Sequence, residues 1–123
     1  MFPRFLLPET VSREDGSGAV IALDQNPGPA LLTLGIDRVI EQESLDVSVW
    51  GSPDGATWRP LASFPQKSYC GDYFMELNLA RHPDIRFLRA QWRMGCWADG
   101  PARPLFGFHL KLDKPKSRYA GAA

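Results

Sequence analysis

The chain has 123 residues, no net formal charge at pH 7 and 44% hydrophobic residues. A chain of this length forms one domain and buries about two-thirds of its surface, which is enough for a core without disulfides or metals. The neutral balance disfavours a nucleic-acid-binding protein. No stretch reaches the roughly 20 apolar residues of a membrane span. Residues 1–8 are too short and too proline-broken for a signal peptide, so we expect a cytoplasmic or particle-associated protein.

Residues 1–18 begin with large apolar side chains and continue into Glu14-Asp-Gly-Ser-Gly18, a composition typical of a flexible loop. We interpret the segment as an apolar N-terminal arm followed by a flexible joint. Such an arm could fold back onto its own domain or dock on another subunit, and the sequence leaves both alternatives open. Its candidate interface residues are Phe2, Phe5, Leu6 and Leu7.

Residues 19–112 show short apolar runs with the period of two that is typical of half-buried strands. Leu45, Val47 and Val49 are one example, and Pro53 and Gly55 then supply a reversing turn. The expected strands are residues 19–23, 30–40, 45–50, 58–64, 72–79, 85–94 and 105–112. No stretch has a helical pattern of useful length. The sequence therefore predicts an all-β fold, a single antiparallel, jelly-roll-like β-sandwich of seven or eight strands.

Charge is unevenly distributed along the chain. Residues 1–44 carry three basic and seven acidic side chains, whereas residues 111–123 carry four basic and one acidic. Residues 113–123 show no hydrophobic periodicity, so we interpret them as a basic, flexible tail. The tail could be solvated, or it could contact an acidic neighbour such as the N-terminal third of another copy.

The sequence contains no convincing catalytic or metal-binding constellation. His82 and His109 are its only histidines, and neither stands beside a recognisable nucleophile motif. Cys70 and Cys96 alternate with these histidines at 12- to 14-residue intervals, not in the short pairs that build zinc sites. We expect no enzyme, no cofactor and no metal. The sequence does not decide whether the two cysteines are free or bridged.

Aromatic and arginine side chains are the better candidates for binding. Trp50 faces away from the apolar side of its strand, so it either packs in a second layer or is exposed at an interface, where tryptophan is enriched. The last third of the chain is rich in arginine, a residue favoured at interfaces because it is planar and makes bidentate contacts. The longest loop could form a carbohydrate site, or its tryptophan could cap the open end of the sandwich. The candidate ligand-binding residues there are Trp97, Asp99 and Arg103, with Arg93 leading into the loop.

Residues 47–58 contain Ser-Pro-Asp-Gly-Ala-Thr-Trp, and residues 85–90 read Ile-Arg-Phe-Leu-Arg-Ala. These two segments resemble the discoidin family, also described as coagulation-factor C-domain-like or galactose-binding-like modules. In that family a strand ends in Ser-x-Asp-Gly-x-x-Trp and a later strand reads Arg-Tyr-Leu-Arg. Small sandwich proteins of phage particles look similar. The resemblance implies a non-catalytic jelly-roll module that binds glycans or lipids or serves in subunit assembly. The cysteine pair that clamps the ends of many discoidin domains is missing here.

These observations predict a non-enzymatic β-sandwich subunit that acts through protein–protein contacts, as an assembly, accessory or structural component. Its partners would be other protein subunits or further copies of the same chain. The alternative is a discoidin-like carbohydrate-binding module that uses the loop around Trp97.

Overall fold

A computed structural model describes residues 4–26, 28–40, 44–67, 69–94 and 105–114. Within this part of the chain almost every residue outside the turns is in a strand. The strands are β1 (Arg4–Ser12), β2 (Gly16–Ser17), β3 (Ile21–Ala22), β4 (Pro29–Ile40), β5 (Leu45–Ser52), β6 (Arg59–Lys67), β7 (Gly71–Asn78), β8 (Phe87–Met94) and β9 (Leu105–Asp113). A single 3-10 turn, η1 (Leu79–Arg81), follows β7. No helix in the described residues is long and apolar enough to cross a membrane.

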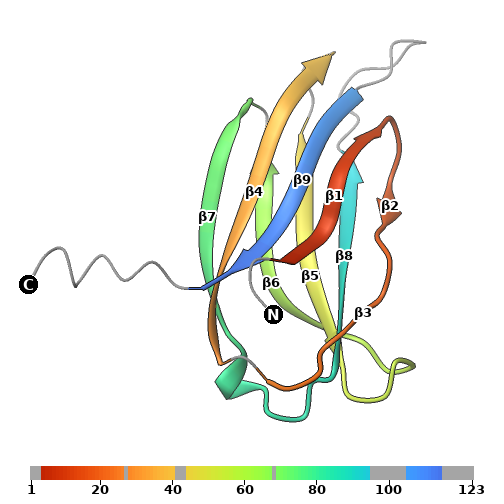
Figure 1. Ribbon diagram of the computed structural model, residues 1–123. Coiled ribbons are helices and arrows are strands. Elements are labelled where there is room, and N and C mark those ends of the chain that lie inside the picture. The colour runs from red at the N-terminus through yellow and green to blue at the C-terminus, as the bar shows by residue number, and fades with distance from the viewer. Residues whose placement is uncertain (1–3, 27, 41–43, 68, 95–104, 115–123) are drawn as a thin grey trace, which may run out of the picture.

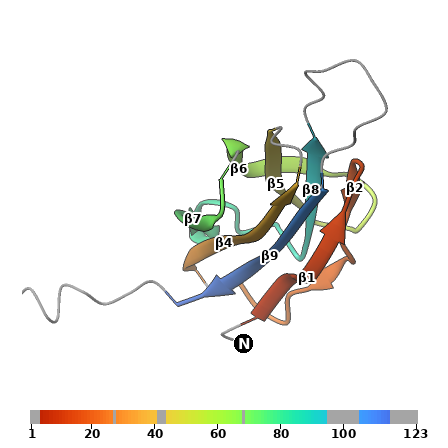
Figure 2. The same cartoon turned by 90° about the horizontal axis from the view of Figure 1, so that it is seen from above.

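The strands form two antiparallel sheets that face each other (Figures 1 and 2). The front sheet has the order β1-β9-β4-β7. The back sheet has the order β2-β8-β5-β6, and β3 also pairs with β8. The predicted antiparallel β-sandwich is confirmed, with seven strands of eight or more residues and two strands of two residues.

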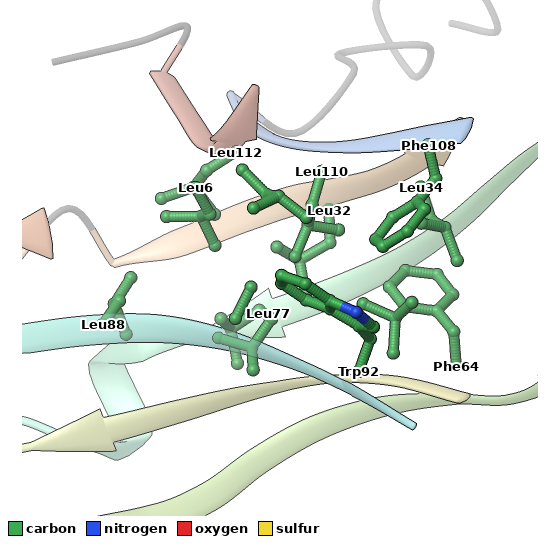
Figure 3. Packing of buried hydrophobic residues seen from close by; sticks show 14 of the residues in the cluster. Leu6, Leu32, Leu34, Phe64, Leu77, Leu88, Trp92, Phe108, Leu110 and Leu112 are labelled. Atoms are coloured by element: carbon green, nitrogen blue, oxygen red, sulfur yellow. The ribbon is translucent and has the colours of Figure 1, made fainter. Parts of the chain in front are cut away.

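The core lies between the sheets because one side of each strand is apolar. On β5 the buried residues alternate with partly exposed ones, as the sequence predicts for Leu45, Val47 and Val49. Figure 3 shows side chains from both sheets pointing toward one another, with Trp92 of β8 among them. The fully buried side chains with the largest volumes are Phe64, Phe106, Phe108, Leu6, Leu32, Leu34, Leu45, Leu79, Ile85, Leu88, Leu110 and Leu112.

Of the two alternatives for the apolar N-terminal segment, its described residues show the first, because they fold back onto their own domain. Residues 4–12 form β1, which pairs with β9 along one margin of the front sheet. Leu6 and Leu7, predicted as interface residues, are only 1% and 5% exposed and belong to the core. Register shifts on both sides of Leu7 explain how two consecutive side chains can both point inward. Their burial removes both residues from any surface that a partner could reach.

Among the described residues of the predicted arm interface, Phe5 remains accessible. Its side chain is 49% exposed on the outer side of the front sheet. The ring stands edge-on to the imidazole of His109, with centroids 5.9 Å apart. Phe2 lies outside the described residues.

Candidate binding face

The outer side of the back sheet carries a group of aromatic and arginine side chains. Strand β5 places Trp50 there, because Val47 and Val49 point into the core and their neighbours must point outward. In the register of the sheet Trp50 lies opposite Arg89 of β8 on one side and Pro60 of β6 on the other. The indole Nε1 donates a hydrogen bond to Ser48 Oγ at 2.9 Å, which fixes the ring along its own strand.

Arg89 is held against a second tryptophan. Its guanidinium carbon lies 4.5 Å from the centroid of the Trp58 ring, within the range of a cation–π contact. Arg89 Nε is buried and has no hydrogen-bond partner among the described residues. A buried N–H without a partner costs free energy, and such groups in a native structure call for an explanation. We use the name Trp50 face for the surface formed by Trp50, Trp58 and Arg89.

Polar side chains extend the Trp50 face along β8. Gln91 and Arg93 follow Arg89 at intervals of two residues and therefore lie on the same side of the sheet. Gln91 pairs with Ser48, and Arg93 pairs with Asp46 near the end of β5. Arg93 is exposed, so a ligand on this face could reach it.

The connection from β5 to β6 holds Trp58 in place through a tight hydrogen-bonded turn. Ser52 Oγ accepts hydrogen bonds from the backbone N–H groups of Gly55 at 2.7 Å and Asp54 at 3.2 Å. The Asp54 carboxylate accepts the N–H groups of Ala56 and Thr57, both at 2.8 Å. These hydrogen bonds lower the pKa of Asp54, and the bond from the Thr57 N–H is the largest cause, ahead of the bond from Ala56. The residue before Trp58 is thereby pinned to the turn.

The start of β6 is tied to the segment before β8. Both terminal nitrogens of Arg59 donate to the two carboxylate oxygens of Asp84 at 2.8 Å. This bidentate bond lowers the pKa of Asp84 to about 2. Two elements that flank the Trp50 face are therefore fixed relative to each other.

The structure brings some of the predicted site residues together and separates others. Trp50 and Arg93 lie on the same outer face, at pairing positions four residues apart along β8, or about 13 Å. Phe5 lies on the outer side of the other sheet and cannot share a site with them. The predictions for Trp97, Asp99 and Arg103 fall outside the described residues.

Sequence reasoning did not select Trp58 and Arg89 as site residues. A signal for Arg89 was present, because Leu88, Ala90 and Trp92 form the apolar side of β8 and their neighbours must lie outside. The contact with Trp58 depends on the pairing of β5 with both β6 and β8, which a period of two does not reveal.

A cluster of titratable groups, separate from the Trp50 face, lies on the front sheet. His109 Nδ1 lies 3.3 Å from Glu9 Oε2. A hydrogen bond with Asp37 is the largest cause that raises the pKa of Glu9. Among the described residues, no group of three or more His, Cys, Asp or Glu side chains is arranged to hold a metal ion. Cys70 is an exposed free thiol, and Cys96 lies outside the described residues.

Among the described residues, two clefts lie toward the end of the sandwich that carries η1. One, of about 280 Å³, is lined by residues 23–26 together with Pro83, Ile85 and Arg86. The other, of about 330 Å³, lies beside the margins of β6 and β7 and is lined by Leu61, Glu76, Leu77, Asn78, Arg81 and His82. Neither includes a residue of the Trp50 face.

Comparison with solved structures finds the same kind of fold in two unrelated settings. The adhesin domain of Lys-gingipain from Porphyromonas gingivalis W83 matches 82% of this chain and 64% of its own, with a TM-score of 0.51 and 10% identity. A chain in the structure of infectious bursal disease virus, Gx strain, matches 99% of this chain and 35% of its own, with a TM-score of 0.53 and 13% identity. These similarities show the fold alone.

The chain spans less than two-thirds of the length of both structures that it resembles. No protein-family model matches the sequence, and a search of curated proteins finds no significant match.

Proposed function

We propose that the protein is a non-catalytic β-sandwich subunit that binds another protein through the Trp50 face. The observation that carries the proposal is Arg89, which is stacked on Trp58 beside a partly exposed Trp50 and retains a buried N–H without a partner among the described residues. Tryptophan and arginine are the residues most enriched in the energetic centres of protein interfaces.

The Trp50 face is better explained as a surface that binds a partner than as part of the core. Stacking on Trp58 holds the Arg89 guanidinium in one plane, so less side-chain entropy is lost when a partner binds it. The two sheets already bury their apolar sides against each other, and the Trp50 face is therefore not needed to close the sandwich. An adhesin domain and a virus protein share the fold, and this analogy agrees with an interaction role.

The proposal assigns no reaction to the protein. Within the described residues, neither His82 nor His109 forms a hydrogen bond with a serine or cysteine side chain. His82 is 3.5 Å from Arg59, and His109 is engaged with Glu9 on the other sheet. Each histidine therefore lies beside a charged side chain and not beside a nucleophile that it could activate as a general base.

A carbohydrate ligand is the second candidate for this surface. Two partly exposed tryptophans next to arginine and glutamine side chains could stack a sugar ring and bind its hydroxyl groups. The discoidin resemblance also implies glycan binding, and the sequence separately offers Trp97, Asp99 and Arg103, with Arg93 before them, as candidate ligand-binding residues. On this alternative the ligand would extend from the Trp50 face toward Arg93.

Affinity capture with the immobilised full chain tests the first proposal. The wild type is compared with a Trp50→Ala/Arg89→Ala double variant, and Tyr69→Ala, at a side chain that is 67% exposed, serves as the matched control. We expect the wild type and the control to retain a partner protein. The double variant should retain at least tenfold less of that protein. Thermal unfolding checks that all three chains are folded. Equal retention by all three would contradict the proposal, and glycan-array binding lost only in the double variant would support the second candidate.

A further inference from the structure

Strand β7 is a regular edge strand that forms one margin of the front sheet. It has eight residues, no proline, and an unbroken antiparallel ladder with β4 from Pro29↔Asn78 to Ile36↔Gly71. Among the described strands, β4 is its only neighbour in the sheet. Figure 1 shows β7 in green at the margin of the front sheet, next to β4.

The other margins carry features that discourage further pairing. Strand β1 has two register shifts and contains Pro8. Strand β6 contains Pro60 and Pro65 and shifts register against β5. Strands β2 and β3 have two residues each. A regular margin without such features is a template on which another extended segment can pair.

The outward-pointing side chains of β7 are acid, aromatic and acid. Asp72, Phe74 and Glu76 are exposed, and Phe74 is 56% exposed. The intervening Tyr73 and Met75 pack against the core. An added strand would therefore meet two negative charges and one ring on the outer side of the sheet.

The cleft of about 330 Å³ lies directly beside this margin. Glu76, Leu77 and Asn78 of β7 line it, together with Leu61 of β6. Peptides that extend a sheet gain affinity from main-chain hydrogen bonds and specificity from pockets that take alternate side chains. The margin of β7 offers both.

We propose that residues 114–118 of one copy of this chain add as an antiparallel strand to β7 of a second copy. Lys114, Lys116 and Arg118 are spaced by two, so an extended segment presents all three cations on one side. One register places Lys114 opposite Glu76, Lys116 opposite Phe74 and Arg118 opposite Asp72. Opposite charges and cation–π pairs in such positions stabilise a sheet. Pro115 is acceptable in a margin strand where its nitrogen faces away from β7.

The distance within one chain favours a second copy. Asp113 at the end of β9 pairs with Leu31 of β4, and Leu31 pairs with Glu76 of β7. The far side of β7 is therefore three strand spacings from Asp113, or about 14 Å. Crossing that distance uses about four residues, which would consume both lysines before pairing begins. A tail from another copy has no such constraint.

The experiment measures self-association of the full chain by sedimentation at low ionic strength. Two charge-reversed variants are prepared, Lys116→Glu/Arg118→Glu in the tail and Asp72→Lys/Glu76→Lys on β7. Each alone is expected to weaken association at least tenfold, and an equimolar mixture of the two is expected to restore it, because the reversed tail fits the reversed margin. Glu14→Lys/Asp24→Lys makes the same change of charge at two other exposed residues and should associate like the wild type.

Hydrogen exchange of the β7 amides provides the second readout. Protection of residues 72–76 should rise with protein concentration in the wild type and in the mixture, but not in either variant alone. A wild type that stays monomeric, a mixture without restored association, or protection that is independent of concentration would each overturn the proposal. The Trp50 face lies on the other sheet, so Trp50→Ala/Arg89→Ala should leave this association unchanged whether or not the proposed function holds.

Discussion

Trp92 of β8 and Phe108 of β9 meet edge to face between the two sheets, with ring centroids 5.4 Å apart and an interplanar angle of 76°. The Trp92 indole also reaches the connection between β1 and β2, where its Nε1 donates to the carbonyl oxygen of Glu14 at 2.9 Å. One side chain thereby joins both sheets and satisfies its polar atom at the rim of the core.

This position of Trp92 makes Gly16 intolerant of a side chain. A Cβ atom on Gly16 would lie 2.5 Å from Cζ2 of the indole, closer than two carbon atoms can approach. We expect Gly16→Ala to lower the free energy of unfolding by about 1–3 kcal/mol, measured by chemical denaturation. Ser17→Ala, at the exposed next residue, should change it little. The Gly16→Ala cost should shrink in a Trp92→Phe background, and an equal cost in both backgrounds would contradict the steric explanation.

The turn that carries Trp58 depends on the backbone of Gly55, whose φ is +82°. Valine at that position is strained, so we expect Gly55→Val to cost more than about 1 kcal/mol of stability. Asparagine tolerates positive φ better than other side chains, and Gly55→Asn should therefore cost less. Equal thermal destabilisation by the two substitutions would mean that the positive φ is not what requires glycine.

The alternation of apolar residues was sufficient to predict the sandwich. Leu45, Val47 and Val49 carry the period of two without interruption, and all three are buried as expected. The sequence left the placement of the N-terminal segment open because β1 contains register shifts beside Leu7. A shift breaks the period of two, so the segment looks like an unstructured apolar arm although it pairs with β9 at the far end of the chain.

The Trp50 face was predictable only in part. Trp50 was selected because its position in the alternation points outward, and this inference needs only the residues of one strand. The stacking of Arg89 on Trp58 needs residues from β8 and from the turn before β6 to meet. Which strands lie beside one another is decided by packing over the whole core, and that information is not contained in any single stretch.

The ion pair between Arg59 and Asp84 should make the stability of the protein depend on pH under acidic conditions. Its hydrogen bonds lower the pKa of Asp84 from 3.8 to about 2, so the folded state favours the ionised carboxylate. The resulting stability is fully present above pH 3.8 and is lost as the pH falls through about 2. We expect the dependence of stability on pH in this interval to weaken in Asp84→Asn and equally in Arg59→Gln. Unchanged acid unfolding curves would contradict a pairing that persists in solution.

The contribution of Glu9 to stability should change with pH in the direction opposite to that of Asp84. The hydrogen bond with Asp37 raises the pKa of Glu9 above its usual 4.5, burial and the charge of Asp37 act in the same direction, and His109 opposes them. The folded state therefore disfavours the ionised form of Glu9. Stability from this group increases as the pH falls through the raised pKa toward 4.5, and it is lost as the pH rises again.

Carbon-detected NMR titration of the Glu9 carboxyl group measures this shift directly. We expect a midpoint above 4.5 in the wild type, a lower midpoint in Asp37→Asn because the largest cause is removed, and a higher one in His109→Gln because the opposing group is removed. The two substitutions thus move the same signal in opposite directions, which a general loss of structure would not do. A midpoint that Asp37→Asn leaves unchanged would show that the two carboxyl groups do not share a proton.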